Sequence, residues 1–82
     1  VDLSNGGFYL RLRTDKPQLD LRVEGNGYEG ALSPDAASIV ATMFAVNELV
    51  WGGADHLDEA FYKLREYAIQ HPEASRILGA ID

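Results

Sequence analysis

Four serines and two histidines are the side chains of this 82-residue sequence that could support nucleophilic catalysis. A serine nucleophile needs a general base within hydrogen-bond reach and a third group that orients the base. Neither His56 nor His71 lies near a strand–turn–helix motif of the Gly-x-Ser-x-Gly kind. A small hydrolase that uses Ser4 or Ser75 with a histidine therefore stays as an alternative, and we predict that the protein is not an enzyme.

Four neighbouring side chains, Asp55, His56, Asp58 and Glu59, contain the oxygen and nitrogen atoms that metal ions bind. On a helix His56 would point about 100° away from Asp55, so the four side chains do not share one face. Acids in the first turn of a helix also interact favourably with its dipole. We therefore expect these acids to start a helix, and we predict no metal site.

The stretch Ser4, Asn5, Gly6 and Gly7 consists of turn-forming residues. A phosphate-binding loop would need more glycines, a lysine and a helix directly after it, whereas a strand is expected to follow here. We interpret the stretch as a turn and predict no cofactor site. Because exposed turns often carry binding residues, the turn is also a candidate contact surface.

The chain has seven bases and thirteen acids, a formal net charge of −6. Direct nucleic-acid binding is not expected, because affinity for a duplex depends on Lys and Arg at the phosphates. A surface that mimics DNA is also disfavoured, since half of the eight acids after residue 33 lie at expected helix starts: Asp35, Asp55, Asp58 and Glu73. The sequence contains no cysteine, which excludes thiol catalysis, and no apolar run long enough to span a membrane.

The first third of the chain has the alternating pattern of strands. Residues 8–13 place Phe8, Leu10 and Leu12 on one face and Tyr9, Arg11 and Arg13 on the other. Residues 19–24 alternate in the same way, and the Asn26-Gly27 pair is a strong hairpin signal before a strand at 28–32. These segments predict a three-stranded antiparallel meander.

Helix signals fill the remainder of the chain. Ser33 and Pro34 predict an N-cap and a first helical residue, and Gly52-Gly53 predicts the end of that helix after Trp51. A second helix is expected to open with a capping box at Asp55 and to stop at His71-Pro72, and a short third one to start at Pro72-Glu73. The predicted fold class is α+β, with three helices packed on one face of the sheet.

Aromatic residues at helical spacing usually belong to the core, and we interpret Phe44, Trp51 and Tyr67 in this way. Tyr62 is the exception, because it falls on the polar side of the second helix beside Asp58 and Glu66. An exposed aromatic residue flanked by acids could anchor a partner protein.

Several short motifs follow one another along the chain: Leu3-Ser4-Asn5-Gly6-Gly7-Phe8-Tyr9, Gly25-Asn26-Gly27-Tyr28, Leu32-Ser33, Asp35-Ala36-Ala37, Leu64-Arg65, Tyr67-Ala68, His71-Pro72-Glu73 and Ala80-Ile81-Asp82. In this order they resemble the KlcA/ArdB antirestriction family over essentially the whole sequence. The resemblance implies a single domain, residues 1–82, that corresponds to the C-terminal part of a longer family chain.

The resemblance also implies a function. A member of this family is expected to be a cytoplasmic protein of plasmids and other mobile elements that protects incoming plasmid or phage DNA. It would inhibit host type I restriction without catalysis, through contacts with the restriction-modification complex or an associated host factor. A weak homodimer stays open, and the alternative function is a generic acidic interaction domain with a target unrelated to restriction.

No catalytic residue is carried over from the family. The contact residues that we predict lie in turns, on a polar helix face and at the chain end: Ser4, Asn5, Gly6, Asn26, Tyr62 and Asp82.

Overall fold

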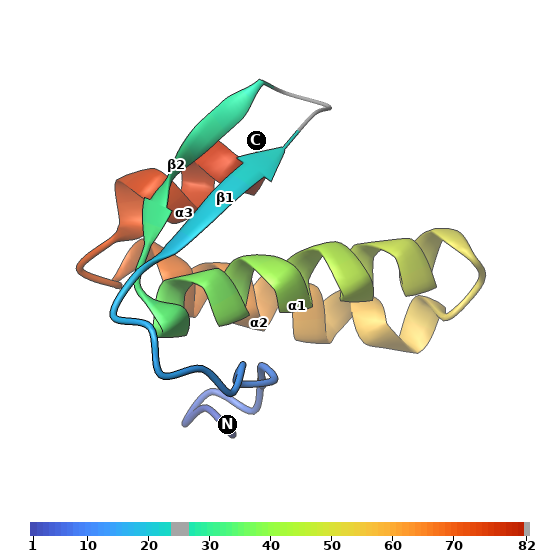
Figure 1. The fold of residues 1–82 in the computed structure, drawn as a ribbon. Helices are drawn as coiled ribbons and strands as arrows, with labels where there is room; N and C mark the ends of the chain where they lie inside the picture. Colours follow the sequence, from blue (N-terminus) through green and yellow to red (C-terminus); the bar gives the residue numbers. More distant parts are fainter. Residues whose placement is uncertain (24–26, 82) are drawn as a thin grey trace.

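The structure is a computed structural model that describes residues 1–23 and 27–81. A β-hairpin is followed by a helical layer in which α1 is the longest element (Figure 1). The elements are β1 (Leu19–Val23), β2 (Tyr28–Leu32), α1 (Pro34–Trp51), the short 3₁₀ helix η1 (Asp55–Leu57), α2 (Asp58–Ile69) and α3 (Ala74–Ile81). No helix among the described residues is both long and apolar enough to cross a membrane.

The hairpin predicted from the alternating pattern is confirmed. Strands β1 and β2 pair antiparallel, from Leu19 opposite Leu32 to Val23 opposite Tyr28. Gly27 has a positive φ of 74°, the conformation for which glycine is favoured at a hairpin turn. The preceding turn residue, Asn26, lies outside the described residues.

The strand predicted at residues 8–13 is wrong. In the part of the chain that the structure describes, the sheet has two strands, and only an isolated bridge between Asp2 and Phe8 involves this segment. The predicted apolar face is also wrong, since Leu10 is 71% and Leu12 44% exposed, while Tyr9 on the predicted polar face is 3% exposed. The reason is that the segment lies against a helix instead of a strand.

Helix α1 begins as predicted. The hydroxyl oxygen of Ser33 accepts a hydrogen bond from the backbone N–H of Ala36, and Pro34 occupies the first turn. At the other end the N–H of Gly52 donates to the carbonyl of Glu48, and Gly53 has a positive φ of 110°. The N-terminal half of α1 is largely buried, whereas its C-terminal turns are largely exposed.

The starts of the other two helices differ from the prediction. Residues Asp55–Leu57 form the 3₁₀ helix η1, and α2 begins at Asp58 without a side-chain cap. The expected capping box at Asp55 is therefore not formed. Helix α3 begins at Ala74, after a turn that contains Pro72 and Glu73, and the carbonyl of Glu73 accepts the N–H groups of Arg76 and Ile77.

Helix α1 occupies the centre of the molecule (Figure 1). It contacts both strands on one side and α2 on another, while α3 contacts β2, α1 and α2. Helices α1 and α3 thus cover the hairpin, and α2 packs chiefly on the other two helices, so the expectation that all three helices cover the sheet is wrong. The largest core side chains are those of Leu32, Ile39, Met43, Leu64 and Ile77.

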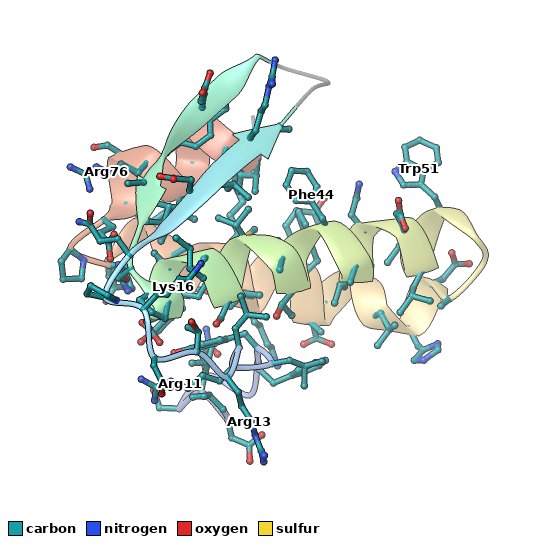
Figure 2. The ribbon with its side chains drawn as sticks, viewed as in Figure 1. Arg11, Arg13, Lys16, Phe44, Trp51 and Arg76 are labelled. Carbon is teal, nitrogen blue, oxygen red and sulfur yellow. The ribbon has the colours of Figure 1, made fainter. Side chains whose placement is uncertain are left out.

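The aromatic residues assigned to the core are not buried. Trp51 is 84% exposed, and Phe44 and Tyr67 are exposed over more than a third of their surface. Trp51 lies in the last turn of α1, beyond the reach of the hairpin (Figure 2). Tyr62 is 61% exposed, as predicted from its position on the polar side of α2.

Candidate functional site

The predicted turn at Ser4, Asn5 and Gly6 is present and lies on helix α2. The N–H of Leu3 donates to the carbonyl of Gly7, and the side-chain oxygen of Asn5 accepts from the N–H of Gly7. The side-chain amide of Asn5 then donates to the backbone carbonyl of Lys63 over 2.9 Å. Asn5 therefore both closes the turn and fastens it to α2.

Two glycines permit this close approach. A Cβ on Gly7 would lie 2.9 Å from the Cβ of Lys63, which is closer than such atoms come in proteins. Gly6 has a positive φ of 90°, and a Cβ there would lie 3.0 Å from Nζ of the same lysine. The turn can pack on α2 only because both positions have no side chain.

Turn and helix together form a surface hollow. It is lined by Leu3, Ser4 and Asn5 from the turn and by Glu66, Tyr67 and Gln70 from α2. Tyr62 lies one helical turn before Glu66 and is largely exposed. The structure thus places Ser4, Asn5 and Gly6 on α2, the helix that also carries Tyr62. The other two predicted contact residues, Asn26 and Asp82, lie outside the described residues.

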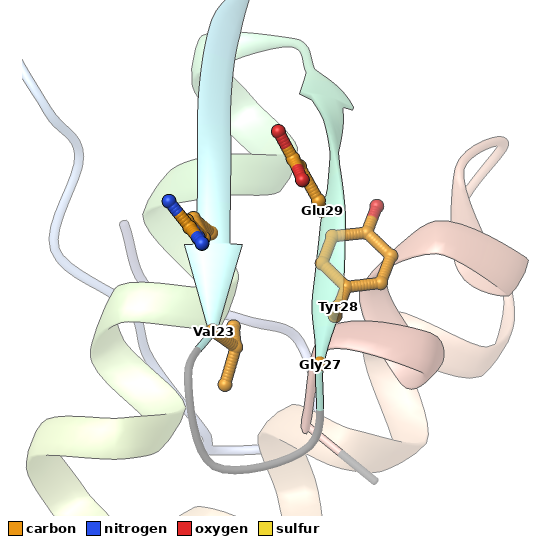
Figure 3. A pocket seen from close by; sticks show the side chains of 5 residues that line it. Val23, Gly27, Tyr28 and Glu29 are labelled. Carbon is orange, nitrogen blue, oxygen red and sulfur yellow. The ribbon is translucent and has the colours of Figure 1, made fainter.

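A second hollow lies at the end of the hairpin (Figure 3). Its lining includes Arg22 and Glu29, which are opposite each other in the strand register. The remaining lining residues are Val23, Gly27 and Tyr28. Because this lining contains no serine and no histidine, it offers no nucleophile with a matching base.

A partly buried polar network connects the N-terminal segment, the start of α1 and the turn before α3. The hydroxyl of Tyr9 donates to one carboxylate oxygen of Asp35 over 2.5 Å. Nε2 of His71 lies 2.9 Å from the other oxygen of Asp35, and the His71 side chain is only 8% exposed. The ring of Tyr67 stacks on Tyr9 and meets His71 edge-on.

The second half of the network is centred on Glu73. Its carboxylate accepts one hydrogen bond from the backbone N–H of Ser33 over 2.9 Å and another from the Ser33 hydroxyl. The backbone N–H of Glu73 donates to Nδ1 of His71 over 3.0 Å. Since Nδ1 accepts, Nε2 carries the proton, and the neutral ring donates to Asp35.

The network sets the protonation of its members. Burial would raise the pKa of the Asp35 carboxyl, but hydrogen bonds from Tyr9 and His71 outweigh burial and lower it. Burial would also raise the pKa of Glu73, and the two hydrogen bonds from Ser33 lower it in the same way. Burial, together with the hydrogen bond to Asp35, raises the pKa of the Tyr9 hydroxyl. Both carboxylates are therefore ionised at neutral pH.

This arrangement does not form a nucleophile and base pair. Both ring nitrogens of His71 are engaged, one by Asp35 and one by the Glu73 N–H. Ser33 is also occupied, because its hydroxyl donates to Glu73 and accepts from the N–H of Ala36. The contacts of the described residues link neither Ser4 nor Ser75 to a histidine. The network therefore has a structural role: its hydrogen bonds hold together segments that are distant in the sequence.

Sequence reasoning identified three members of this network only by other roles. Ser33 was predicted as a cap, and Asp35 and Glu73 were interpreted as helix-start acids. Tyr9 and His71 were not predicted to be partners, although each lies in one of the motifs shared with the family. One signal in the sequence could have indicated that these residues are partners. The family motifs contain all five residues of the network: Tyr9, Ser33, Asp35, His71 and Glu73.

The acids and His56 near the start of α2 do not gather around a common point. Among the described residues no three histidine, aspartate or glutamate side chains are grouped in a way that could hold a metal ion. His56 is exposed in η1, away from the His71 network.

The comparisons with known proteins agree with the motifs. A family model described as antirestriction protein matches residues 1–82. Two relatives from Escherichia coli, each named antirestriction protein KlcA, are 46% identical over 85 residues and are matched by 98% of this chain. A third, uncharacterized protein YfjX from Escherichia coli (strain K12), is 37% identical over 84 residues.

The chain is shorter than these proteins. It spans 58% and 59% of the two KlcA proteins and 54% of YfjX. It is also similar to a solved structure, with a TM-score of 0.87 and 44% identity over 96% of this chain and 58% of that one. That structure is described as showing a novel fold for KlcA and ArdB and antirestriction activity against type I DNA restriction systems in vivo but not in vitro. This chain belongs to the antirestriction protein family.

Proposed function

We propose that this chain protects incoming plasmid or phage DNA in the cytoplasm by inhibiting the host type I restriction-modification system through protein contacts. The observation that carries the proposal is the family match over residues 1–82, together with 46% identity to proteins named for antirestriction. Because the chain spans only 58% of the KlcA relative, we propose that residues 1–82 are one domain of a longer functional unit.

The behaviour of the solved relative bears on the partner. Its activity against type I systems is described as present in vivo but not in vitro. A protein that blocked the restriction enzyme by binding alone should act in both settings. The difference supports a partner or condition that the cell supplies, so an associated host factor is as suitable a target as the restriction complex itself.

A mechanism without catalysis is supported by the occupied histidine. His71, the more buried of the two histidines, has both ring nitrogens in hydrogen bonds that hold the fold together. General-base catalysis needs a nitrogen free to take a proton from a nucleophile. We propose that the network maintains the shape of the contact surface and takes no part in a reaction.

The charge of the chain supports protein contacts over DNA contacts. The net charge of −6 repels phosphates, and the carboxylates of Asp35 and Glu73 are engaged in the partly buried network instead of a DNA-like surface. The proposed contact surface is the turn of Ser4, Asn5 and Gly6 with the exposed ring of Tyr62. We also propose Asn26 and Asp82 as contact residues.

The test is the plating efficiency of unmodified phage on a type I restricting host that expresses the chain. We expect plating to rise toward that on a non-restricting host, which serves as the control strain. Equal plating with and without expression would contradict the proposal.

Two sets of variants test the proposed contact surface and the proposed absence of catalysis separately. Ser4→Arg combined with Tyr62→Ala should reduce protection, whereas Trp51→Ala, which removes another exposed aromatic ring, should not. His56→Ala and Ser75→Ala should keep full protection, since a non-catalytic protein uses neither group as acid, base or nucleophile. Loss of protection in either of these two variants, with normal protein levels, would indicate a reaction.

A further inference from the structure

Residues 10–13, which were predicted to be part of a strand, run along helix α1. Two of their backbone N–H groups pair with side-chain hydroxyls of the helix. The N–H of Leu10 donates to Oγ1 of Thr42 over 3.0 Å, and the N–H of Leu12 donates to Oγ of Ser38 over 2.8 Å. Four residues of a helix rise about 6.0 Å, and two residues of an extended chain span about 6.6 Å. The two hydroxyls therefore match the repeat of one strand edge, so α1 occupies the place of a neighbouring strand.

This arrangement leaves the other edge of the segment open beyond Tyr9, whose backbone N–H and C=O both pair with Val1. In an extended chain the N–H and C=O groups of alternate residues point to opposite edges. The groups of Leu10 and Leu12 face α1, so those of Arg11 and Arg13 face outward. Among the backbone contacts of the described residues, none involves the N–H or C=O of Arg11 or Arg13. Open edges of this kind are where proteins accept an added strand.

The side chains beside this edge are strongly basic. Arg11, Arg13 and Lys16 are all exposed and supply three of the seven bases of the chain within six residues. The Arg13 side chain extends away from α1 (Figure 2), whereas Arg11 lies close enough to Asp35, in the first turn of α1, for its charge to help lower the pKa of that carboxyl. Asp15 is the single acid among these six residues. A chain with a net charge of −6 thus presents a local positive edge.

Exposed leucines alternate with the arginines. Leu10 is 71% exposed and Leu12 is 44% exposed. On an added strand, side chains directly opposite these positions would meet leucines on one face and arginines on the other. The edge therefore favours a strand in which apolar and acidic residues alternate.

We propose that the outer edge of residues 10–13 binds an extended, acidic segment of a partner protein by β-strand addition. The inference rests on the proposed function, because it specifies the chemistry of the partner that the antirestriction surface contacts. Backbone hydrogen bonds to Arg11 and Arg13 supply the pairing, and ion pairs to Arg11, Arg13 and Lys16 select acidic sequences.

Charge argues against two other occupants. A second copy of this edge would place arginines against arginines, and like charges directly opposite each other across strands are destabilising. A nucleic acid would meet three bases on a molecule whose remaining charge is strongly negative. Both occupants remain as outcomes of the test below.

The test is an NMR titration of the ¹⁵N-labelled chain with the peptide acetyl-Val-Glu-Val-Glu-Val-Glu-amide. Binding should shift the amide signals of residues 10–13 and slow hydrogen exchange at the N–H groups of Arg11 and Arg13, which a purely ionic contact would not protect. A 12-base-pair DNA duplex and the chain alone at increasing concentration are titrated in parallel. Stronger binding to the duplex, or self-association through these amides, would overturn the proposal.

Three variants distinguish the contribution of the arginine charge to peptide binding from that of the backbone hydrogen bonds. Arg13→Gln should weaken peptide binding by about threefold to tenfold, whereas Arg22→Gln, which removes an exposed arginine of β1, should change it less than twofold. Arg13→Pro removes the outward N–H as well as the charge and should weaken binding by a further factor of about ten compared with Arg13→Gln. Equal binding of the Gln and Pro variants would exclude strand addition.

The outcomes separate this inference from the proposed function. If the wild-type chain protects phage DNA but does not bind the peptide, the inference fails and the function stands. If the peptide binds with protection of the Arg11 and Arg13 amides but phage plating does not change, the binding edge stands and the antirestriction proposal fails.

Discussion

Ser33 and Glu73 are forty positions apart in the sequence, yet the Glu73 carboxylate accepts both the backbone N–H and the hydroxyl of Ser33. Ser33 is the N-cap of α1, and Glu73 lies directly before α3. One carboxylate therefore fixes the start of the central helix to the start of the last one.

Removing this carboxylate should destabilise the fold. We expect Glu73→Ala to lower the free energy of unfolding by about 2 kcal/mol, because two charge-assisted hydrogen bonds are lost and the Ser33 groups are left without partners. Glu73→Gln, which keeps one acceptor, should cost about half as much. Urea unfolding followed by far-UV circular dichroism measures both variants.

Glu59 offers the matched control. Its carboxylate lies 3.1 Å from Nζ of Lys63 one turn later on α2 and is largely exposed. Exposed ion pairs of this kind contribute about 0.3–0.5 kcal/mol, so Glu59→Ala should stay within that range. Equal losses for Glu73→Ala and Glu59→Ala would contradict the structural role of Glu73.

Stability should fall in acid. The pKa values of Asp35 and Glu73 are lowered in the folded protein. A lowered pKa means that the unfolded chain takes up protons first, so stability is present above the unfolded values of about 4 and is lost as the pH falls through the folded ones. Thermal unfolding from pH 7 to pH 2 should show this loss, with a smaller slope in Glu73→Gln. A stability that is constant below pH 4 would exclude the effect.

Tyr9 should make the protein less stable at alkaline pH. Its raised pKa means that the unfolded chain loses the phenolic proton first, so stability declines above about pH 10. Tyr9→Phe should lower stability by about 1.5 kcal/mol at neutral pH, because Asp35 loses a hydrogen bond. Tyr62→Phe removes an exposed hydroxyl and should change stability by less than about 0.5 kcal/mol. Both variants are compared by urea unfolding at pH 7 and pH 11.

The packing of the N-terminal turn on α2 should depend on Gly7. Gly7→Ala would force a Cβ against that of Lys63, and we expect a loss of about 1–3 kcal/mol, as for other overpacked sites. Hydrogen exchange at the Leu3 and Gly7 amides should become faster in this variant. Gly53→Ala is the control for strain without a clash, since φ there is 110° and no atom lies near the added Cβ. Unchanged exchange at the turn would mean that its contact with α2 is not tight.

The exposed side chain of Leu10 gives a direct test of the fold. Leu10→Ser should change stability by less than about 0.5 kcal/mol because the side chain is exposed. Leu32→Ala, which truncates a fully buried leucine of β2, should cost about 2–5 kcal/mol. A large loss of stability in Leu10→Ser would contradict the exposed position of Leu10 and support the three-stranded sheet that the alternating pattern predicted.

The sequence by itself determined the elements whose signals are local. Ser33 and Pro34 start α1, Gly52 and Gly53 end it, and the alternation at residues 19–23 and 28–32 gives the hairpin, because capping and strand periodicity depend on neighbours in the chain. The exposure of Tyr62 followed from its place on the polar side of a helix. The order of short motifs was enough to indicate the family.

Only the tertiary structure decided what each local pattern faces. The alternation at residues 8–13 is the same for a strand beside a strand and for an extended segment beside a helix, and it was the Ser38 and Thr42 hydroxyls of α1 that selected the second. The partners of Tyr9, Asp35, His71 and Glu73 also lie beyond the reach of periodicity. Their hydrogen bonds join residues 26 to 40 positions apart, and such contacts depend on how the whole chain packs.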